Sequence, residues 1–445
     1  MIKYTRVFIT FLLAAIALGA TAQSTTTATS SPYSRYGLGD YTPSLLPQNW
    51  AMGGIGTAIN NISGYNNINP LNPASYGVIN FTTIDAGLYS NINTQSQVGP
   101  NGNTLSATNA SFRLSHVVFA IPVNTHSAFS FGLLPYSELG YNYKQTFTRN
   151  GSSGKPGSVD TLTNNIYSGE GSLSKAYIGY GLHITKHLLI GANFAYIFGN
   201  LAEYSSTESN LYGTLNSKIQ QSNAVGGANY DYGAQYSIDF GQTKHVILGY
   251  SASTGNSLNS TSTYIVSNYT YDSSGNENLA ADSVANQKGA KSKIQLPRIN
   301  HFGISFQNDG HVLVGADYTI GNWSALTIDG TNAGLQNSKT LNVGGSWTPN
   351  INALRNYWAR TDYRLGFIYD DTYLNVYNTD IKRYAVTFGL GLPLAPNNTS
   401  FYKINFSAEV GRRGTLDNGL VKENYVNLHL GFTLNDKWFQ RFKFQ

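Results

Sequence analysis

From Phe81 to the C-terminus, the sequence is a series of segments in which apolar and polar residues alternate. A period of two places successive side chains on opposite faces of a β-strand. One such segment, residues 403–411, alternates Ile404, Phe406, Ala408 and Val410 with Asn405, Ser407 and Glu409. About fourteen segments of this kind can be recognised, an even number as in single-chain bacterial membrane barrels. The pattern predicts an all-β fold, a transmembrane antiparallel β-barrel of about fourteen strands.

The connections between these segments alternate between long and short. The long ones include residues 93–108, 146–169, 205–227 and 254–294, and the short ones include residues 123–125, 185–187, 242–244 and 308–310. Outer-membrane barrels have short turns in the periplasm and long loops outside the cell, so we expect both termini to be periplasmic. The loops expected at 205–227 and 254–294 are strongly polar, which argues against a surface that captures hydrophobic molecules.

Composition excludes several other classes of protein. Only 11% of the 445 residues are charged, against roughly 25% in soluble proteins. After the N-terminus there is no apolar run long enough for a membrane helix. The absence of Cys excludes disulfides, thiolate metal sites and a lipidated Cys. The net charge of +5 is spread without basic runs, so no nucleic-acid partner is expected. The eight His are scattered, and no motif predicts a metal, a cofactor or an enzyme.

The N-terminus has the form of a secretory signal. Lys3 and Arg6 precede an apolar core over residues 7–18, and Ala20-Thr21-Ala22 is a cleavage site. We expect a signal peptide over residues 1–22 and a disordered mature start over 23–31, which is rich in Ser and Thr. Export followed by a barrel pattern predicts the outer membrane of a Gram-negative bacterium.

A stretch ahead of the first strand has neither strand nor helix character. Residues 50–76 are rich in Gly and Asn and end in Asn69-Pro70 and Asn72-Pro73, which favour turns. We expect residues 32–78 to form a hatch, or plug, inside a barrel that spans residues 79–445. Asn and Gly suit a segment that must hydrogen-bond to a polar lumen.

Charged residues on the predicted strands are expected to face the lumen, because a charge facing lipid costs about 2–4 kcal/mol near the midplane. The basic members of this set are Arg113, Arg364 and Arg383. Two interpretations stay open. The charges pair with one another and with the plug, or one of the arginines receives an anionic ligand.

Several short motifs resemble the FadL-type outer-membrane transporters of long-chain fatty acids and other hydrophobic molecules. They include Met52-Gly53-Gly54, Gly56-Thr57-Ala58, Asn72-Pro73-Ala74, Leu296-Pro297-Arg298 and Val314-Gly315-Ala316-Asp317-Tyr318. The resemblance implies passive uptake of fatty-acid-like molecules, gated by the hatch and ending in lateral exit through the wall. The implied hatch residues are Pro32, Tyr33, Arg35, Tyr36, Gly53, Gly54, Asn72, Pro73 and Ala74.

The lateral exit in this family lies where the third strand kinks inward. The matching residues here are Pro135, Tyr136, Glu138 and Gly140. Proline removes a ladder donor and is confined to edges and bulges, and Gly140 permits a bend. The other interpretation is that the strand extends above the membrane, where Pro135 is harmless.

The opening Ser31 to Asp40 looks like members of this superfamily other than the fatty-acid transporters proper. This departure leaves the substrate open. The superfamily also resembles the PorV-type barrels, which implies an alternative function in protein secretion or in holding surface proteins; a structural role in the outer membrane is a third. The partners expected are outer-membrane lipid, a hydrophobic small molecule, the barrel-assembly machinery and, in the alternative, secreted proteins. The C-terminal Phe442-Lys443-Phe444-Gln445 departs from an assembly signal that ends on an aromatic residue.

Overall fold

The computed structural model describes residues 31–62, 65–99, 101–149, 161–209, 214–272, 274, 276–278, 283–395 and 400–437. The predicted signal peptide and all of the predicted disordered start except Ser31 lie outside these residues. The wall strands are β4 (Thr82–Val98), β5 (Thr104–Asn124), β6 (Ser127–Arg149), β7 (Thr161–His183), β8 (Leu188–Ser209), β9 (Asn216–Asp239), β10 (Lys244–Ser253), β11 (Ser257–Tyr269), β12 (Ser283–Gln295), β13 (Ile299–Asn308), β14 (Val312–Gly321), β17 (Ser338–Trp347), β18 (Asp362–Val376), β19 (Thr379–Pro393), β20 (Ser400–Arg413) and β21 (Lys422–Asp436).

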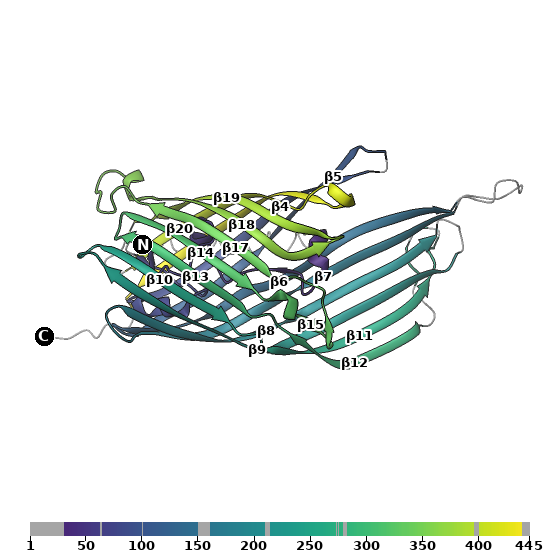
Figure 1. Ribbon diagram of the computed structural model, residues 1–445, viewed down its shortest axis with the longest axis horizontal. Coiled ribbons are helices and arrows are strands. Elements are labelled where there is room, and N and C mark those ends of the chain that lie inside the picture. The colour runs from purple at the N-terminus through teal and green to yellow at the C-terminus, as the bar shows by residue number, and fades with distance from the viewer. Residues whose placement is uncertain are drawn as a thin grey trace, which may run out of the picture.

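These strands form one closed antiparallel barrel (Figure 1). Strands that are neighbours in the wall pair with each other, and β21 pairs with β4 from Asp436↔Thr82 to Lys422↔Ser96, which closes the wall. Strand β9 pairs with both β10 and β11, and β10 and β11 pair in turn with β13 and β12. Strands β10 and β11 thus make up one wall strand, and β12 and β13 make up the next. Each of these two wall strands is interrupted by three residues. The predicted all-β barrel of fourteen strands is confirmed.

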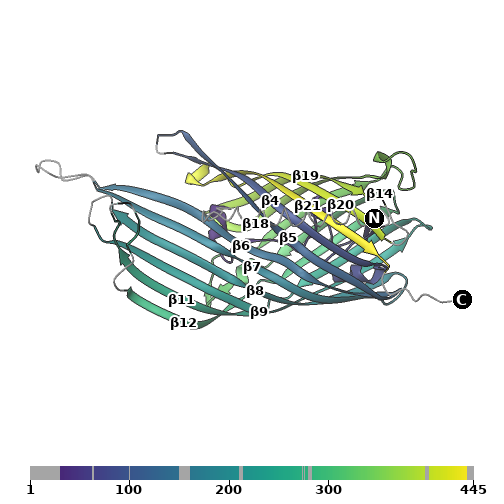
Figure 2. The ribbon, with the colours of Figure 1, turned by 180° about the vertical axis from the view of Figure 1, so that it is seen from behind.

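One side of the barrel is much taller than the other. Strands β6 to β9 have 22 to 24 residues, whereas β13, β14 and β17 have 10. The upper parts of β6 to β9, with β11 and β12, form a sheet that projects beyond the rest of the wall (Figures 1 and 2). The prediction of long loops over 205–227 and 254–294 was therefore wrong, because most of these residues are in strands. Both faces of this projecting sheet carry polar residues, so the sequence lacks the alternation that identifies a half-apolar strand.

A belt of apolar side chains covers the outside of the wall. A single row across neighbouring strands joins Ile92, Val426, Val410, Val386, Phe367 and Val343. Val410 and Val386 are each 49% exposed. Soluble proteins rarely expose so large a contiguous apolar surface, whereas membrane barrels place it against lipid.

Within the described residues, no helix is both long and apolar enough to cross a membrane. The helical elements are α2 (Pro47–Trp50) and the 3-10 turns η1 (Pro32–Arg35), η2 (Pro73–Val78), η3 (Trp323–Ala325), η4 (Trp358–Arg360) and η5 (Asp417–Gly419). The remaining short strands are β1 (Asp40–Tyr41), β2 (Asn61–Ile62), β3 (Tyr65–Asn66), β15 (Thr327–Ile328) and β16 (Thr331–Asn332).

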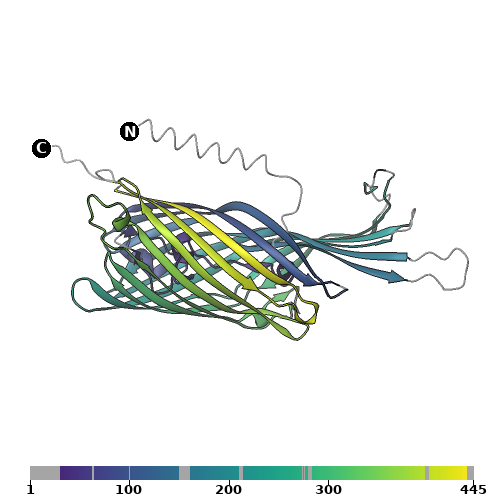
Figure 3. The same ribbon diagram turned by 90° about the horizontal axis from the view of Figure 1, so that it is seen from above.

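Residues 31–62 and 65–79, here called the lumen segment, lie inside the barrel (Figure 3). Leu46, Ala51 and Met52 are fully buried in it. The segment touches the wall at glycines: a Cβ on Gly344 would clash with the Met52 carbonyl, and one on Gly191 would clash with Pro73. Strand glycines that face the lumen thus allow the backbone of the segment to pack directly on the backbone of the wall.

This packing predicts that a side chain at Gly344 displaces the lumen segment. Overpacking of a filled interior costs about 1–3 kcal/mol, so Gly344→Val should lower the thermal midpoint and loosen the segment. Because the chain has no Cys, Met52→Cys reports on this with a maleimide. The buried thiol should be unreactive alone and reactive when combined with Gly344→Val. The control combines Met52→Cys with Val343→Ala, on the lipid face, and the thiol should stay unreactive there. Equal labelling of the Gly344→Val and Val343→Ala proteins would contradict the packing.

Candidate functional site: an open seam and a charged cavity

The wall is incomplete between β5 and β6. Their ladder runs from Asn124↔Ser127 to Val117↔Leu133 and ends there. Beyond this point β5 pairs with β4 up to Thr104, and β6 pairs with β7 up to Arg149. The β4–β5 hairpin diverges from β6 in Figures 1 and 2. We call this gap in the ladder the seam.

The residues predicted to form a kink lie at the seam. The register between β6 and β7 shifts between Pro135 and Ser137, so that Tyr136 is an extra residue. A bulge of this kind bends a strand and increases its twist. Because Pro135 also lacks an amide hydrogen, β6 loses ladder capacity at the level where its pairing with β5 ends.

The lumen segment covers the edge of β6 that β5 leaves free. Strand β1 pairs with β6 at Asp40↔Glu138 and Tyr41↔Ser137. The Thr42 amide donates to the Tyr136 carbonyl at 2.9 Å, and the Ser31 amide donates to the Gly140 carbonyl, also at 2.9 Å. The backbone groups of β6 from Tyr136 to Gly140 are therefore satisfied from inside the barrel.

One ion pair bridges the seam. Arg113 of β5 pairs with Glu138 of β6, and both side chains are about a quarter exposed. The Arg113 guanidinium also lies over the Tyr89 ring, 4.8 Å from its centroid. Since β5 and β6 share no backbone hydrogen bonds at this level, the ion pair is a side-chain connection where a ladder would normally hold the wall together.

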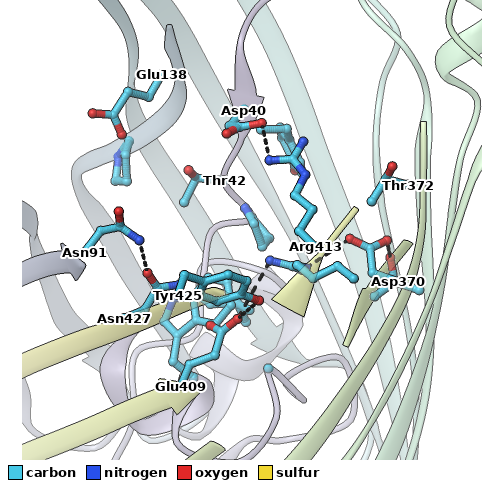
Figure 4. Close-up of a pocket in the computed structure, with 18 of the residues that line it drawn as sticks. Asp40, Thr42, Asn91, Glu138, Asp370, Thr372, Glu409, Arg413, Tyr425 and Asn427 are labelled. Atoms are coloured by element: carbon cyan, nitrogen blue, oxygen red, sulfur yellow. Dashed lines mark hydrogen bonds and ion pairs between the residues drawn. The ribbon is translucent and has the colours of Figure 1, made fainter. Parts of the chain in front are cut away.

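A cavity of about 240 Å³ lies behind the seam, between the wall and the lumen segment. Ser111, Arg113, Ser115, Pro135 and Glu138 line it on the seam side. The rest of its charged lining comes from the lumen segment and from other wall strands: Asp40, Asp317, Asp370, Arg383, Glu409, Arg413 and Glu423. Figure 4 shows Asp40, Glu138, Asp370 and Glu409 around this space.

The charges in the cavity are largely paired with one another. Arg413 contacts Asp40 at 2.9 Å, and Arg383 lies 3.3 Å from Asp370 and 3.9 Å from Glu409. The Tyr425 hydroxyl donates to Glu409 at 2.7 Å. These groups therefore fit the interpretation in which the lumen charges pair with one another and with the plug. Carboxylates nevertheless outnumber arginines in the lining of the cavity. Two of these carboxylates each have one buried oxygen with no hydrogen-bond partner among the described residues, Oε2 of Glu409 and Oε1 of Glu423.

An apolar cluster closes the lumen at the end where the strands are tall. Tyr33 and Leu38 of the lumen segment pack there with residues from strands and connecting turns of the wall, among them Tyr136, Trp323 and Tyr373. The Tyr33 hydroxyl donates to the Val421 carbonyl at 2.5 Å. Burial raises the pKa of Tyr33 to about 12, so the phenol stays a neutral donor.

The other predicted hatch residues are distributed along the lumen segment. Pro32 begins η1, and Tyr36 is partly buried against the apolar cluster. Arg35 is exposed and lies 5.0 Å from the centroid of the Tyr167 ring. The Gly53 amide donates to Thr387 at 2.7 Å, and Gly54 lines the cavity.

Asn72, Pro73 and Ala74 form the start of η2. The Asn72 side chain accepts from the Ala74 amide at 3.1 Å and donates to the Thr57 carbonyl at 2.6 Å. The three residues are buried against β7, β8 and β9. This motif therefore anchors the lumen segment to the wall.

The three arginines singled out in the sequence have different surroundings. Arg113 and Arg383 line the cavity. Arg364 is buried elsewhere, 2.7 Å from Asp362 and 2.8 Å from Asn405. Sequence reasoning missed Arg413, because the apolar alternation of β20 ends at Gly411 and only the observed strand continues to Arg413. It also missed Asp40, which carries no strand or turn signal.

Comparison with known proteins places this geometry in a family. The family model BamG matches residues 1–445, the whole chain. The chain belongs to the BamG family. None of the curated proteins compared matches the sequence. Among the described residues of this BamG-family chain, no group of three His, Asp or Glu side chains could hold a metal ion.

Solved structures of similar fold include a Pseudomonas aeruginosa FadL homologue, which has a TM-score of 0.53 and covers 90% of this chain and 99% of its own. The P. putida toluene transporter TodX has a TM-score of 0.57 and covers 90% and 100%, and the CymD monoaromatic hydrocarbon channel has a TM-score of 0.50 and covers 91% and 100%. Each is 14% identical to this chain. The expected FadL-like barrel fold is confirmed, and the likeness concerns the fold alone.

The ion pair across the seam yields a charge-swap prediction. Arg113→Glu places two acids opposite each other, and loss of a partly exposed pair costs up to about 1 kcal/mol, or about fivefold in an opening equilibrium. Labelling of Ser115→Cys with a water-soluble maleimide should accelerate by that factor. The double variant Arg113→Glu with Glu138→Arg should restore the slow rate. Equal rates in all three proteins would show that the pair does not hold the seam.

Proposed function

We propose that this protein is a non-enzymatic outer-membrane subunit that works with the barrel-assembly machinery by holding partner proteins. The observation that carries this proposal is that the whole chain matches the BamG family model. The name of this family points to the barrel-assembly machinery. The proposal corresponds to the interaction alternative left open by the sequence.

The lumen supports this proposal because it is poorly suited to a hydrocarbon. A ligand in the cavity would lie against Asp40, Glu138, Asp370 and Glu409. Although these groups pair with one another, apolar atoms offer them no hydrogen bonds, and removing charged groups from water is costly. The apolar cluster around Tyr33 and Leu38 is also filled by side chains of the protein itself.

The projecting sheet supports it further. Strands that continue beyond the lipid belt present a broad, ordered surface in place of flexible loops. This surface carries exposed apolar side chains, including Phe147 at 54%, Val284 at 68% and Tyr271 at 41%. Aromatic and apolar groups set in polar surroundings are typical of protein interfaces. With the termini in the periplasm, as we propose, this sheet lies outside the cell.

We expect the tagged protein, extracted from outer membranes in mild detergent, to co-purify with the central barrel of the barrel-assembly machinery. Its depletion should lower the amounts of many outer-membrane barrels together, because a subunit of the machinery acts before any one product. A tagged outer-membrane barrel of unrelated family serves as the control. Purification of the protein alone, with unchanged barrels after depletion, would refute the proposal.

A second candidate function, uptake of hydrophobic molecules, is favoured by one observation, the seam. Relatives in fold are described as toluene and monoaromatic hydrocarbon channels. In this alternative, residues 32–78 act as a hatch, the ligand is fatty-acid-like, and it leaves sideways through the gap beside Pro135.

For this candidate, closing the bulge should reduce uptake. Pro135→Thr restores an amide donor on β6 and leaves the Arg113–Glu138 pair intact, so uptake of a labelled hydrocarbon or fatty acid by cells should fall. The matched control is Thr146→Ser, in the projecting sheet. Uptake that is unchanged, while the protein stays folded and abundant, would remove the seam from any transport path.

A further inference from the structure

The edge of β5 at the seam is an unpaired strand edge at membrane depth. From Thr104 to His116, β5 pairs with β4 on one side, and no described residue pairs with its other side. Every second residue of a strand directs its amide and carbonyl to a given side. The edge therefore presents a regular series of donors and acceptors over about half of these residues.

The lower part of this edge belongs to the lipid belt. Ala110 pairs with Ile92, which starts the apolar row described above. Phe112 and Leu114 are 63% and 57% exposed on the same outer face. Residues 104–109 are more polar, with Ser106, Thr108 and Asn109, and lie beyond the apolar row. The part of the unpaired β5 edge that faces the lipid belt is therefore residues 110–116, here called the open edge.

An open edge within lipid needs a cover. The hydrocarbon region supplies no hydrogen bonds, and each unsatisfied backbone group there costs several kcal/mol. Strand β6 is not available as the cover, because β1, Ser31 and Thr42 already pair with its edge from Tyr136 to Gly140. Closing β5 onto β6 would require displacement of the lumen segment.

We propose that the open edge of β5 receives a transmembrane β-strand of another outer-membrane barrel protein. Donors and acceptors at the two-residue spacing of a strand are complementary to another strand, which is how β-augmentation works. This inference rests on the proposed function, because a subunit of the barrel-assembly machinery meets such strands.

The two sides of the seam specify the character of the incoming strand. On the inner side, Ser111, Arg113 and Ser115 line the polar cavity. On the outer side, Phe112, Leu114 and Leu133 are exposed apolar residues. A strand in the seam therefore needs polar side chains facing in and apolar side chains facing out, in strict alternation. That is the pattern of a transmembrane barrel strand, and it separates this partner from a lipid chain or a soluble peptide.

The test uses a photo-cross-linking residue in place of a native phenylalanine, in the full-length protein in living cells. Phe112→p-benzoylphenylalanine places the probe at the open edge. The matched control is Phe388→p-benzoylphenylalanine, because Phe388 is also in the belt and 47% exposed but pairs with Leu365 and Ala408 on both sides. After irradiation, cross-linked peptides are identified by mass spectrometry.

A peptide adduct at Phe112 that maps to an alternating membrane strand of another barrel, and that is absent at Phe388, is the expected result. Adducts to lipid alone, to a soluble segment, or equally at both positions would overturn the inference. Co-purification with the assembly machinery is measured on the same cells. If it persists without a strand adduct at Phe112, the seam proposal fails while the proposed function stands; if both are lost, both fail.

Discussion

The structure depends on one constraint: every backbone amide and carbonyl at membrane depth needs a hydrogen-bond partner. Closure of the sheet by β21 and β4 meets this requirement over most of the wall. At the seam it is met for one strand only. Strand β6 carries a bulge there, and the lumen segment supplies the partners that β5 does not, whereas the edge of β5 stays open. The lumen segment is thus part of the hydrogen-bonded wall as well as its filling.

The same constraint explains the composition of the lumen segment. To pack against a sheet from inside, its backbone must come close to the strands, and wall glycines such as Gly344 and Gly191 make room for it. Its own polar groups then need partners. Asp317 accepts from the Gly56 and Thr57 amides, each at 2.8 Å. A segment rich in Gly and Asn, with short side chains and many amides, satisfies both demands.

The sequence predicts the fold well wherever each strand has one lipid face and one wet face. Strand β19 shows this, since Val386 and Phe388 point outward and alternate with Thr387. The prediction fails in the projecting sheet, where both faces are wet and the residues of β11 and β12 have the composition of loops. Pro135, which the sequence singles out because proline limits the ladder, lies where the pairing of β6 with β5 ends. The cavity could not be predicted, because Asp40 and Arg413 are 373 residues apart in the chain and meet only through tertiary packing.

The seam and the cavity are one coupled arrangement. Asp40 pairs through its backbone with Glu138 and through its side chain with Arg413, while Glu138 itself holds Arg113 of β5. A strand that adds to β5 enters beside Arg113 and competes for Glu138. Loss of that contact weakens the position of β1, and Arg413 then loses the acid that compensates its charge. If a strand adds to β5 as proposed, these contacts would transmit occupation of the seam to the lumen segment by electrostatics and backbone pairing together. This gives a physical route by which a partner in the membrane alters the plug without passing through it.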